Sequence, residues 1–316
     1  MEALGLRFAH PLGLATGFDK GEVLAPGLFA LGFSHVEIGT VTPRPQPGNE
    51  RPRLFRLPEH RALVNLMGFN NAGAEACAAR LAALAPEDRP GLLGVNVGRN
   101  KTTPNERAAD DYLACIDRLH AHADYLVVNI SSPNTPGLRR LQERAALEGL
   151  LGACVDRARA LPVPKPLLVK LAPDLSDEAL DEAVDVALAV GASGVVATNT
   201  TLQRPGASAG HPQASEAGGL SGAPLEAMAT RAVRRIHLRG GGRLPIVGVG
   251  GIMSAGDAWT KIRAGACLIQ TYTGFIYGGP GYVRGVLQGL EELMRRDGYS
   301  RVSDAIGVDA GREMCV

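Results

Sequence analysis

Residues 167–198, LLVKLAPDLSDEALDEAVDVALAVGASGVVAT, contain two short apolar segments separated by a longer amphipathic one. Leu167–Leu171 and Gly194–Thr198 show no polar alternation, which is typical of parallel strands buried on both faces. Between them, Ser176 precedes two acidic residues and Gly191 ends the amphipathic segment. We therefore expect a helix with a serine N-cap and a glycine just past its last turn, and a strand–helix–strand unit as a whole.

The same alternation recurs along the rest of the chain. Six further candidate strands are Leu12–Thr16, His35–Gly39, Leu92–Val97, Tyr125–Ile130, Ile246–Gly250 and Cys267–Tyr272. Amphipathic segments separate them, and one of these carries Leu147, Leu150, Leu151, Cys154, Ala158 and Leu161 on a single face. Eight β–α units in one series predict an α/β fold of the (β/α)8 TIM-barrel type. An open doubly wound sheet is the alternative.

Two segments interrupt this rhythm. Arg53–Asn65 is predicted to be an inserted β-hairpin that turns at Pro58–His60. Thr200–Gly222 is predicted to be a long active-site loop, because a loop of this length inside a compact domain is usually functional. Thr103–Glu106 has the residues of a helix capping box. We find no linker and no repeat, so residues 1–316 are expected to form a single domain.

Composition excludes several classes of protein. The chain has 33 Lys and Arg against 32 Asp and Glu, a net charge of +1, which argues against a nucleic-acid binder. Its five cysteines are widely spaced and form no CxxC pair, so we expect neither disulfides nor a zinc site, and a cytoplasmic location. No apolar segment is long enough to span a membrane.

Polar residues stand at or just after the ends of the predicted strands, where a barrel of this type has its active site. They include Lys20, Asn96, Asn129, Asn134, Lys170, Thr198 and Asn199. Several amides in one pocket suit a planar heterocycle with C=O and N–H edges, and lysines suit an anionic ligand. Carboxylates are scarce there, no His–Ser–Asp set occurs, and no metal cluster is apparent.

Lys170 is the strongest single indication of a site, because a lysine inside an apolar strand costs free energy unless a ligand or an acid pairs with it. A lone strand-end asparagine, by contrast, is more often a cap or turn residue than a ligand-binding residue. The glycines of Gly248–Gly251 stand where barrels of this type bind phosphate, but they are equally compatible with a simple turn.

Ordered motifs cover nearly the whole chain, from Leu12 to about Gly307. They are Gly13–Lys20, Glu37–Pro43, Asn65–Asn71, Gly94–Gly98, Val128–Arg139, Val169–Asp174, Thr198–Thr200, Gly218–Gly222, Gly248–Ile252 and Tyr272–Phe275. Together they resemble the dihydroorotate dehydrogenases, flavoenzymes of pyrimidine synthesis, and within them the class 2, quinone-dependent type.

The resemblance implies an FMN site and a dihydroorotate or orotate site. FMN would be held by Thr16, Gly17, Phe18, Asp19, Lys20, Thr40, Asn96, Asn129, Lys170, Thr198, Gly222, Gly251, Tyr272 and Thr273, with its phosphate on the turns at Gly251 and Thr273. The substrate would be bound by Lys20, Asn65, Leu66, Met67, Gly68, Phe69, Asn129, Asn134, Asn199 and Thr200. Lys170 would stabilise the anionic reduced flavin.

The implied reaction oxidises the C5–C6 bond of dihydroorotate, with hydride passing to flavin N5 and electrons then to a quinone. Ser132 stands at the position of the base, which is a cysteine in class 1 members, and Thr135 and Phe69 would shape the proton relay. Class 2 members usually carry an N-terminal extension that contacts the membrane. Lys20 comes almost at once here, so we expect that extension to be absent from the chain, and attachment to the cytoplasmic face of the membrane to be weak.

Two alternatives stand beside this interpretation. A different FMN-dependent pyrimidine reductase, such as a dihydrouridine synthase, would carry a cysteine acid and a basic surface. A barrel that binds a phosphate ligand without redox activity would purify without colour. The sequence leaves the oligomeric state open.

Overall fold

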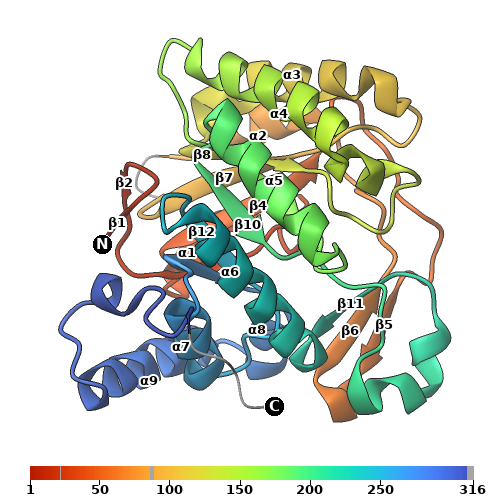
Figure 1. Cartoon of the computed structure of the whole chain (residues 1–316). Coiled ribbons are helices and arrows are strands. Elements are labelled where there is room, and N and C mark those ends of the chain that lie inside the picture. The colour runs from red at the N-terminus through yellow and green to blue at the C-terminus, as the bar shows by residue number, and fades with distance from the viewer. Residues whose placement is uncertain (22, 86–88, 312–316) are drawn as a thin grey trace.

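The protein folds around a closed barrel of eight parallel strands, seen in a computed structural model that describes residues 1–21, 23–85 and 89–311 (Figure 1). Around the barrel the strands follow the order β10-β12-β13-β3-β4-β7-β8-β9. Their bounds are β3 Leu12–Leu14, β4 His35–Val41, β7 Leu92–Val97, β8 Tyr125–Asn129, β9 Leu167–Leu171, β10 Gly194–Ala197, β12 Ile246–Val249 and β13 Leu268–Thr271. The predicted (β/α)8 barrel is therefore confirmed, and each predicted strand lies within two residues of an observed one at either end.

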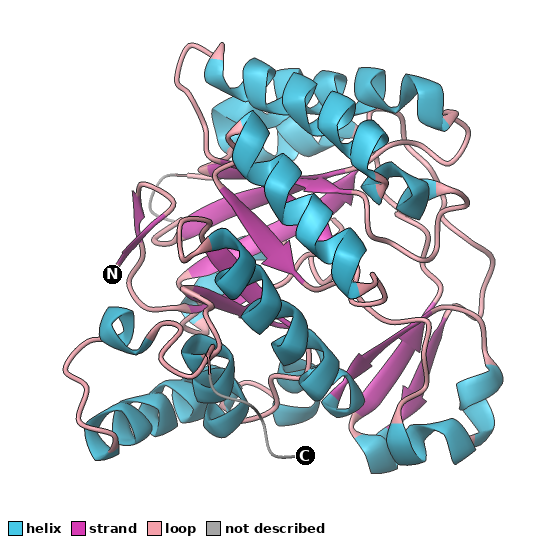
Figure 2. Ribbon diagram, viewed as in Figure 1, coloured by secondary structure: helices cyan, strands magenta, loops and turns pink. Residues whose placement is uncertain are grey.

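Helices surround the barrel on its outer side (Figure 2). They are α1 Ala25–Ala30, α2 Ala74–Ala82, α3 Ala108–Leu119, α4 Arg144–Arg159, α5 Asp177–Val190, α6 Glu226–Gly240, α7 Ala255–Arg263, α8 Thr273–Gly278 and α9 Tyr282–Arg296. In the described ranges no helix is both long and apolar enough to cross a membrane.

Side chains of the barrel strands alternate between the helix layer and the barrel interior. In β9, Leu167, Val169 and Leu171 belong to the large core shared with the helices, whereas Leu168 belongs to the smaller interior core. Because strand side chains repeat every two residues, Lys170 faces the interior with Leu168. The strand is buried throughout, as expected. The position of Lys170 in the alternation of side chains directs it into the barrel interior.

The N-terminal end of the barrel is closed by packing. The short strands β1 (Glu2–Ala3) and β2 (Leu6–Arg7) form a hairpin that precedes Phe8. Phe8 meets the His35 ring edge to face at 5.2 Å, and His35 lies 6.4 Å from the Tyr125 ring. These rings and the interior core fill the N-terminal end of the barrel. The polar residues therefore lie at the opposite, C-terminal end.

A second, three-stranded antiparallel sheet lies beside the barrel (Figure 1). Its strands β5 (Leu54–Leu57) and β6 (Ala62–Asn65) form the predicted hairpin, with a 3₁₀ turn at Pro58–His60. The third strand, β11 (Gly219–Gly222), pairs with β6 and comes from the end of the segment predicted to be loop. Its Gly-Leu-Ser-Gly sequence has too little β propensity to be recognised, and pairing with β6 determines its conformation.

The start of α5 was predicted correctly from the local sequence, whereas the start of α3 was not. Ser176 caps α5 by accepting a hydrogen bond from the Ala179 N–H at 3.2 Å, and Gly191 follows the helix with φ +72°, as predicted. The capping box at Thr103–Glu106 is wrong: a 3₁₀ turn occupies Asn105–Arg107, and α3 begins at Ala108. Arg99 accounts for the difference, because its guanidinium donates to the Thr103 carbonyl at 2.7 Å and to Asn105 Oδ1 at 3.0 Å.

Candidate active site

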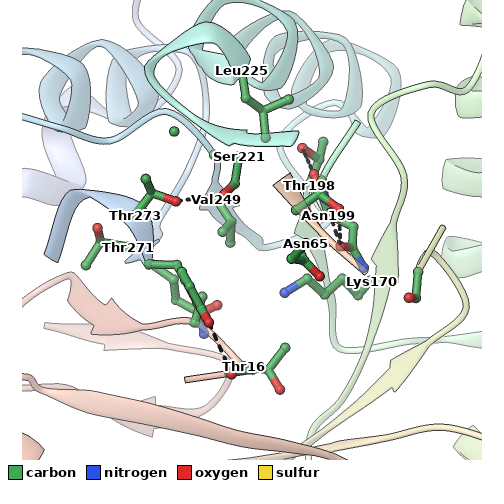
Figure 3. Close-up of a pocket in the computed structure, with 18 of the residues that line it drawn as sticks. Thr16, Asn65, Lys170, Thr198, Asn199, Ser221, Leu225, Val249, Thr271 and Thr273 are labelled. Atoms are coloured by element: carbon green, nitrogen blue, oxygen red, sulfur yellow. Dashed lines mark hydrogen bonds between the residues drawn. The ribbon is translucent and has the colours of Figure 1, made fainter. Parts of the chain in front are cut away.

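A cavity lies between the C-terminal ends of the barrel strands and the three-stranded sheet, and together with the solvent space at its opening it measures about 890 Å³ (Figure 3). Its lining is rich in hydroxyl and amide side chains and includes two lysines, Lys20 and Lys170. No carboxylate lines it in the part of the chain that the structure describes.

Most residues of the sequence hypothesis line this cavity. They are Thr16, Gly17, Lys20, Thr40, Asn65, Met67, Gly68, Phe69, Asn129, Ser132, Asn134, Lys170, Thr198, Asn199, Thr200, Gly222, Gly251, Tyr272 and Thr273. Leu66, Phe18, Asp19 and Asn96 do not line it. The polar residues predicted at the strand ends are therefore brought together, apart from Asn96.

Asn96 does not line the cavity but holds two residues that do, Thr40 and Asn129. Its Oδ1 accepts hydrogen bonds from Thr40 Oγ1 at 2.6 Å and from Asn129 Nδ2 at 3.0 Å. Its Nδ2 donates to Glu37 Oε1 at 2.8 Å. The fully buried Glu37 thus fixes the amide orientation of Asn96, which in turn orients the two side chains that do line the cavity.

Lys170 is buried on all sides by protein except where it meets the cavity. Burial lowers the pKa of its ammonium group, and the negative charge of Glu37 opposes that effect. A lysine in this environment retains its charge most easily when an anion occupies the adjacent space. Figure 3 shows it beside Asn65 and Asn199, on the side of the cavity formed by β9 and β10.

The loop after β8 presents Ser132 and Asn134. The Asn134 N–H donates to Ser132 Oγ at 3.3 Å, and Asn134 Nδ2 donates to Asn65 Oδ1 at 2.9 Å. Arg139 holds this loop against the next, because its guanidinium donates to the carbonyls of Ser131 and Thr200, each at 2.9 Å. Ser132 is only 5% exposed, so bulk water has little access to its hydroxyl.

The loop after β3 is shaped by two predicted residues that do not line the cavity. Asp19 is fully buried, and its carboxylate accepts the backbone N–H groups of Val23 at 3.3 Å and Leu24 at 3.0 Å. Phe18 packs against the rings of Tyr272 and Phe275 at 5.7 and 5.3 Å. Both stabilise the conformation that carries Thr16, Gly17 and Lys20 to the cavity.

The turn after β12 requires its glycines. Gly251 has φ +76°, and a Cβ atom there would lie 2.2 Å from Glu226 Cα at the start of α6. The backbone N–H groups of Gly251 and Ile252 donate to no other group among the described residues. Unpaired N–H groups beside a cavity suit an anion such as phosphate. In the cavity wall, Ser221 Oγ and Thr273 Oγ1 are hydrogen-bonded at 2.8 Å.

Several lining residues were not singled out from the sequence. They are Ala15, Ser221, Leu225, Val249, Ile252, Met253, Gln270, Thr271 and Gly274. Gln270 could have been found by the signal that identified Lys170, a polar residue inside a buried strand. Its Nε2 donates to Glu37 Oε2 at 2.9 Å, while its Oε1 is buried without a partner. Ser221 carried no such signal, because β11 was not predicted.

Comparison with known proteins gives a consistent result. The family described as dihydroorotate dehydrogenase matches residues 1–294. The chain is 69% identical over 309 residues to the dihydroorotate dehydrogenase (quinone) of Anaeromyxobacter dehalogenans (strain 2CP-C), which covers 98% of this chain and 85% of that protein. It is 59% identical over 309 residues to the protein of the same name from Myxococcus xanthus (strain DK1622), over 98% and 84% of the two chains.

The fold comparison agrees. A crystal structure of DHODH from Eimeria tenella in complex with ferulenol superposes with a TM-score of 0.92 at 41% sequence identity, covering 98% of this chain and 87% of that one. The ligand-free form of the same protein gives 0.91 at 41% identity, over 98% and 91%.

Proposed function

The chain belongs to the dihydroorotate dehydrogenase family, and from this premise we propose that its cavity holds FMN beside the substrate and that Ser132 is the catalytic base. The enzyme oxidises dihydroorotate to orotate in pyrimidine biosynthesis and passes the electrons to a quinone. The oxidation removes a proton from C5 and a hydride from C6 and leaves the C5=C6 double bond of orotate. Each of these steps needs a group that accepts what is removed.

The residues of the barrel fit FMN. The unpaired N–H groups of Gly251 and Ile252 suit its phosphate, and the buried ammonium group of Lys170 suits the electron-rich ring. The unpartnered Oε1 of Gln270 adds an acceptor that is buried beside the cavity. When bound, FMN supplies the two-electron acceptor for the hydride. The residues that would hold it also include Thr16, Gly17, Lys20, Thr40, Asn129, Thr198, Gly222, Tyr272 and Thr273.

The substrate would be bound by side-chain amides and one lysine. Asn134 Nδ2 contacts both oxygens of Asn65, and Asn199 Nδ2 donates to Ser131 Oγ at 3.0 Å, so these amides hold one another at the cavity wall. Asn134 Oδ1 has no partner and is available to an N–H of the substrate ring. Lys20 would neutralise the orotate carboxylate.

The single observation that supports Ser132 as the base is its placement. Its hydroxyl lies at the cavity, shielded from bulk water, with its oxygen held by the Asn134 N–H. Among the described residues no carboxylate or imidazole is hydrogen-bonded to it, so activation depends on the closed site and on an onward proton acceptor. Thr135, whose Oγ1 is buried without a partner, would help to pass the proton on, with water as the final acceptor.

The test uses the purified full-length protein. We expect it to carry a flavin that is released by denaturation as FMN, to change its absorption on addition of orotate, and to bleach with dihydroorotate in the absence of oxygen. Dihydrouracil, which lacks the carboxylate, is the matched ligand control and should bleach it far more slowly. A protein that takes up no FMN, or that is reduced equally by both compounds, would contradict the proposal.

A further inference from the structure

A second buried lysine lies outside the cavity. Lys261, on α7, is fully buried, and it is the only described lysine besides Lys170 that is buried. A buried ammonium group is costly unless opposite charge and hydrogen bonds compensate it. Nothing in the reaction described above uses this residue, so its position needs a separate explanation.

The contacts of Lys261 lead from α7 to the start of α6. Its stem packs against β12, where Gly248 leaves room: a Cβ atom on Gly248 would lie 2.9 Å from the Lys261 Cγ and Cδ atoms. Its Nζ donates to Thr230 Oγ1 at 2.7 Å, and Thr230 Oγ1 donates to Glu226 Oε1 at 2.8 Å. The lysine is thus connected to the first residue of α6 through one hydroxyl.

Glu226 lies directly against the turn that is expected to hold phosphate. Its backbone is the nearest group to Gly251, and its Cβ would lie 2.5 Å from a Cβ atom there. A carboxylate beside a phosphate dianion is unfavourable, because like charges in a poorly solvated site repel. The hydrogen bond from Thr230 fixes this carboxylate, and the ammonium group behind it offsets its charge.

We infer that Lys261 is a positioning residue for phosphate binding, which neutralises Glu226 through Thr230 and so allows the Gly250–Gly251 turn to accept the phosphate of FMN. Lys261 does not line the cavity and acts through these two residues. The inference rests on the proposed FMN site and names a residue that sets its affinity for the phosphate.

The charge on Lys261 is sensitive to pH in an accessible range. Burial lowers the pKa of Lys261 to about 8, while the carboxylates of Glu226 on α6 and Asp257 on α7 oppose that effect. Strand β12, against which the lysine stem packs, contains no titratable residue. Because a bound phosphate favours the protonated lysine, affinity for FMN should fall as the pH rises through this range.

The experiment compares FMN with riboflavin, which lacks the phosphate. Full-length protein loaded with either flavin is dialysed to equilibrium between pH 7 and pH 9.5, and the retained flavin gives Kd. We expect Lys261→Met to raise the Kd for FMN about tenfold at neutral pH, as a charge effect of about 1.4 kcal/mol would, and to leave the Kd for riboflavin unchanged. The variant should also lose the rise of the FMN Kd with pH.

Two further variants complete the test. Thr230→Val interrupts the connection but keeps both charges, and it should weaken FMN in the same direction by a smaller factor. Lys165→Met removes an equal charge from the segment before β9 and should leave both constants unchanged.

Each outcome decides the matter. Equal weakening of FMN and riboflavin in Lys261→Met, or no weakening of FMN, would overturn this inference alone. A wild-type protein that retains neither flavin would contradict the FMN site itself and the inference with it. If Lys261→Met does not fold, the Thr230→Val variant and the wild-type pH profile decide, and an FMN Kd that follows riboflavin at every pH would overturn it.

Discussion

The two ends of the barrel interior are filled in opposite ways. At the N-terminal end, the rings of His35 and Tyr125 occupy the axis, and glycines on neighbouring strands make room for them. A Cβ atom on Gly13 would lie 2.2 Å from His35 Nε2, and one on Gly94 2.2 Å from Tyr125 Cζ. At the C-terminal end the same alternation of side chains directs polar groups inward, and the cavity remains between them.

The closed N-terminal end of the barrel therefore contributes to stability, and the open C-terminal end contributes to the reaction. Three of the buried polar atoms without a partner, Asn134 Oδ1, Thr135 Oγ1 and Gln270 Oε1, belong to residues at or next to the cavity, whereas the N-terminal end contributes His35 Nε2. Unpaired buried groups cost folding free energy and are retained where a ligand satisfies them. Substitutions at the cavity should therefore change the reaction, and substitutions at the closed end should change the free energy of unfolding.

The largest expected effect is at the cavity. Ser132→Ala should slow the reduction of bound flavin by dihydroorotate by ~10²–10⁴-fold, the usual contribution of a general base. The substitution removes only the hydroxyl group and leaves Cβ in place, so orotate binding and the unfolding transition should be nearly unchanged. Stopped-flow measurement of flavin reduction gives the rate, and orotate titration gives the binding constant.

A companion variant controls for shape. Ser132→Cys retains a group that accepts the proton and should keep partial activity. A Ser132→Ala rate within threefold of the wild type would remove Ser132 from the mechanism. A loss of unfolding free energy in Ser132→Ala would instead show that the cavity end of the barrel also contributes to stability.

Lys170→Met sharpens the comparison, because Lys170 lines the cavity and its charge also lies near the buried carboxylate of Glu37. Loss of a cation beside the reduced flavin should cost that state about 2–5 kcal/mol, observed as a more negative midpoint potential or weaker flavin retention. It should also lower the free energy of unfolding, because it leaves the fully buried carboxylate of Glu37 without the positive charge of Lys170. Unchanged potential and unchanged retention would show that Lys170 has only a structural role.

The sequence predicted the open end of the barrel better than the closed end. Repeated apolar strands and amphipathic helices were sufficient for the barrel, and the polar residues at the strand ends were brought together apart from Asn96. The family resemblance placed Asn96 on FMN, but in the structure it bridges Glu37 to Thr40 and Asn129. Which amide lines a cavity and which supports it depends on side-chain contacts between strands far apart in sequence.

The remaining differences have the same origin. Strand β11 exists because β6 pairs with it, and the turn before α3 departs from a capping box because Arg99 binds its carbonyl and amide groups. The glycines at 13 and 94 were visible in the sequence, but the rings that occupy their space come from the neighbouring strands β4 and β8. Local propensity carries no information about such partners.

Gly94→Ala tests the closed end directly. The added Cβ atom would overlap the Tyr125 ring, and overpacking of this kind costs about 1–3 kcal/mol of unfolding free energy. Flavin reduction by dihydroorotate should change much less than the stability, because the link from Tyr125 to the cavity lining is one hydrogen bond from Gln270 Nε2 at 3.3 Å. Chemical denaturation measures the first effect and stopped flow the second.

Gly149→Ala is the matched control for this substitution. Gly149 is exposed in the middle of α4, and a Cβ atom there would meet nothing within 4 Å, so alanine should stabilise the helix by roughly 0.5–1 kcal/mol. A Gly94→Ala protein as stable as the wild type would mean that Tyr125 can shift and that the closed end is loosely packed.

The smallest expected effect concerns the acid sensitivity of the closed end. Burial lowers the pKa of His35 to about 3, while the unfolded chain binds a proton at the ordinary histidine value of 6.5. The unfolded state therefore binds more protons between these two values, and stability must fall as the pH drops below 6.5. Between pH 6.5 and pH 5.5 this single group should lower the free energy of unfolding by about 1 kcal/mol.

Urea unfolding of wild type and His35→Phe at the two pH values isolates the contribution of His35, because the other histidines titrate in both proteins and cancel. The phenylalanine ring keeps the contacts with Phe8 and Tyr125, so the variant should lose less stability over this interval than the wild type does. Equal losses in the two proteins would mean that His35 becomes protonated in the folded state, and that the closed end of the barrel admits charge and water as the cavity end does.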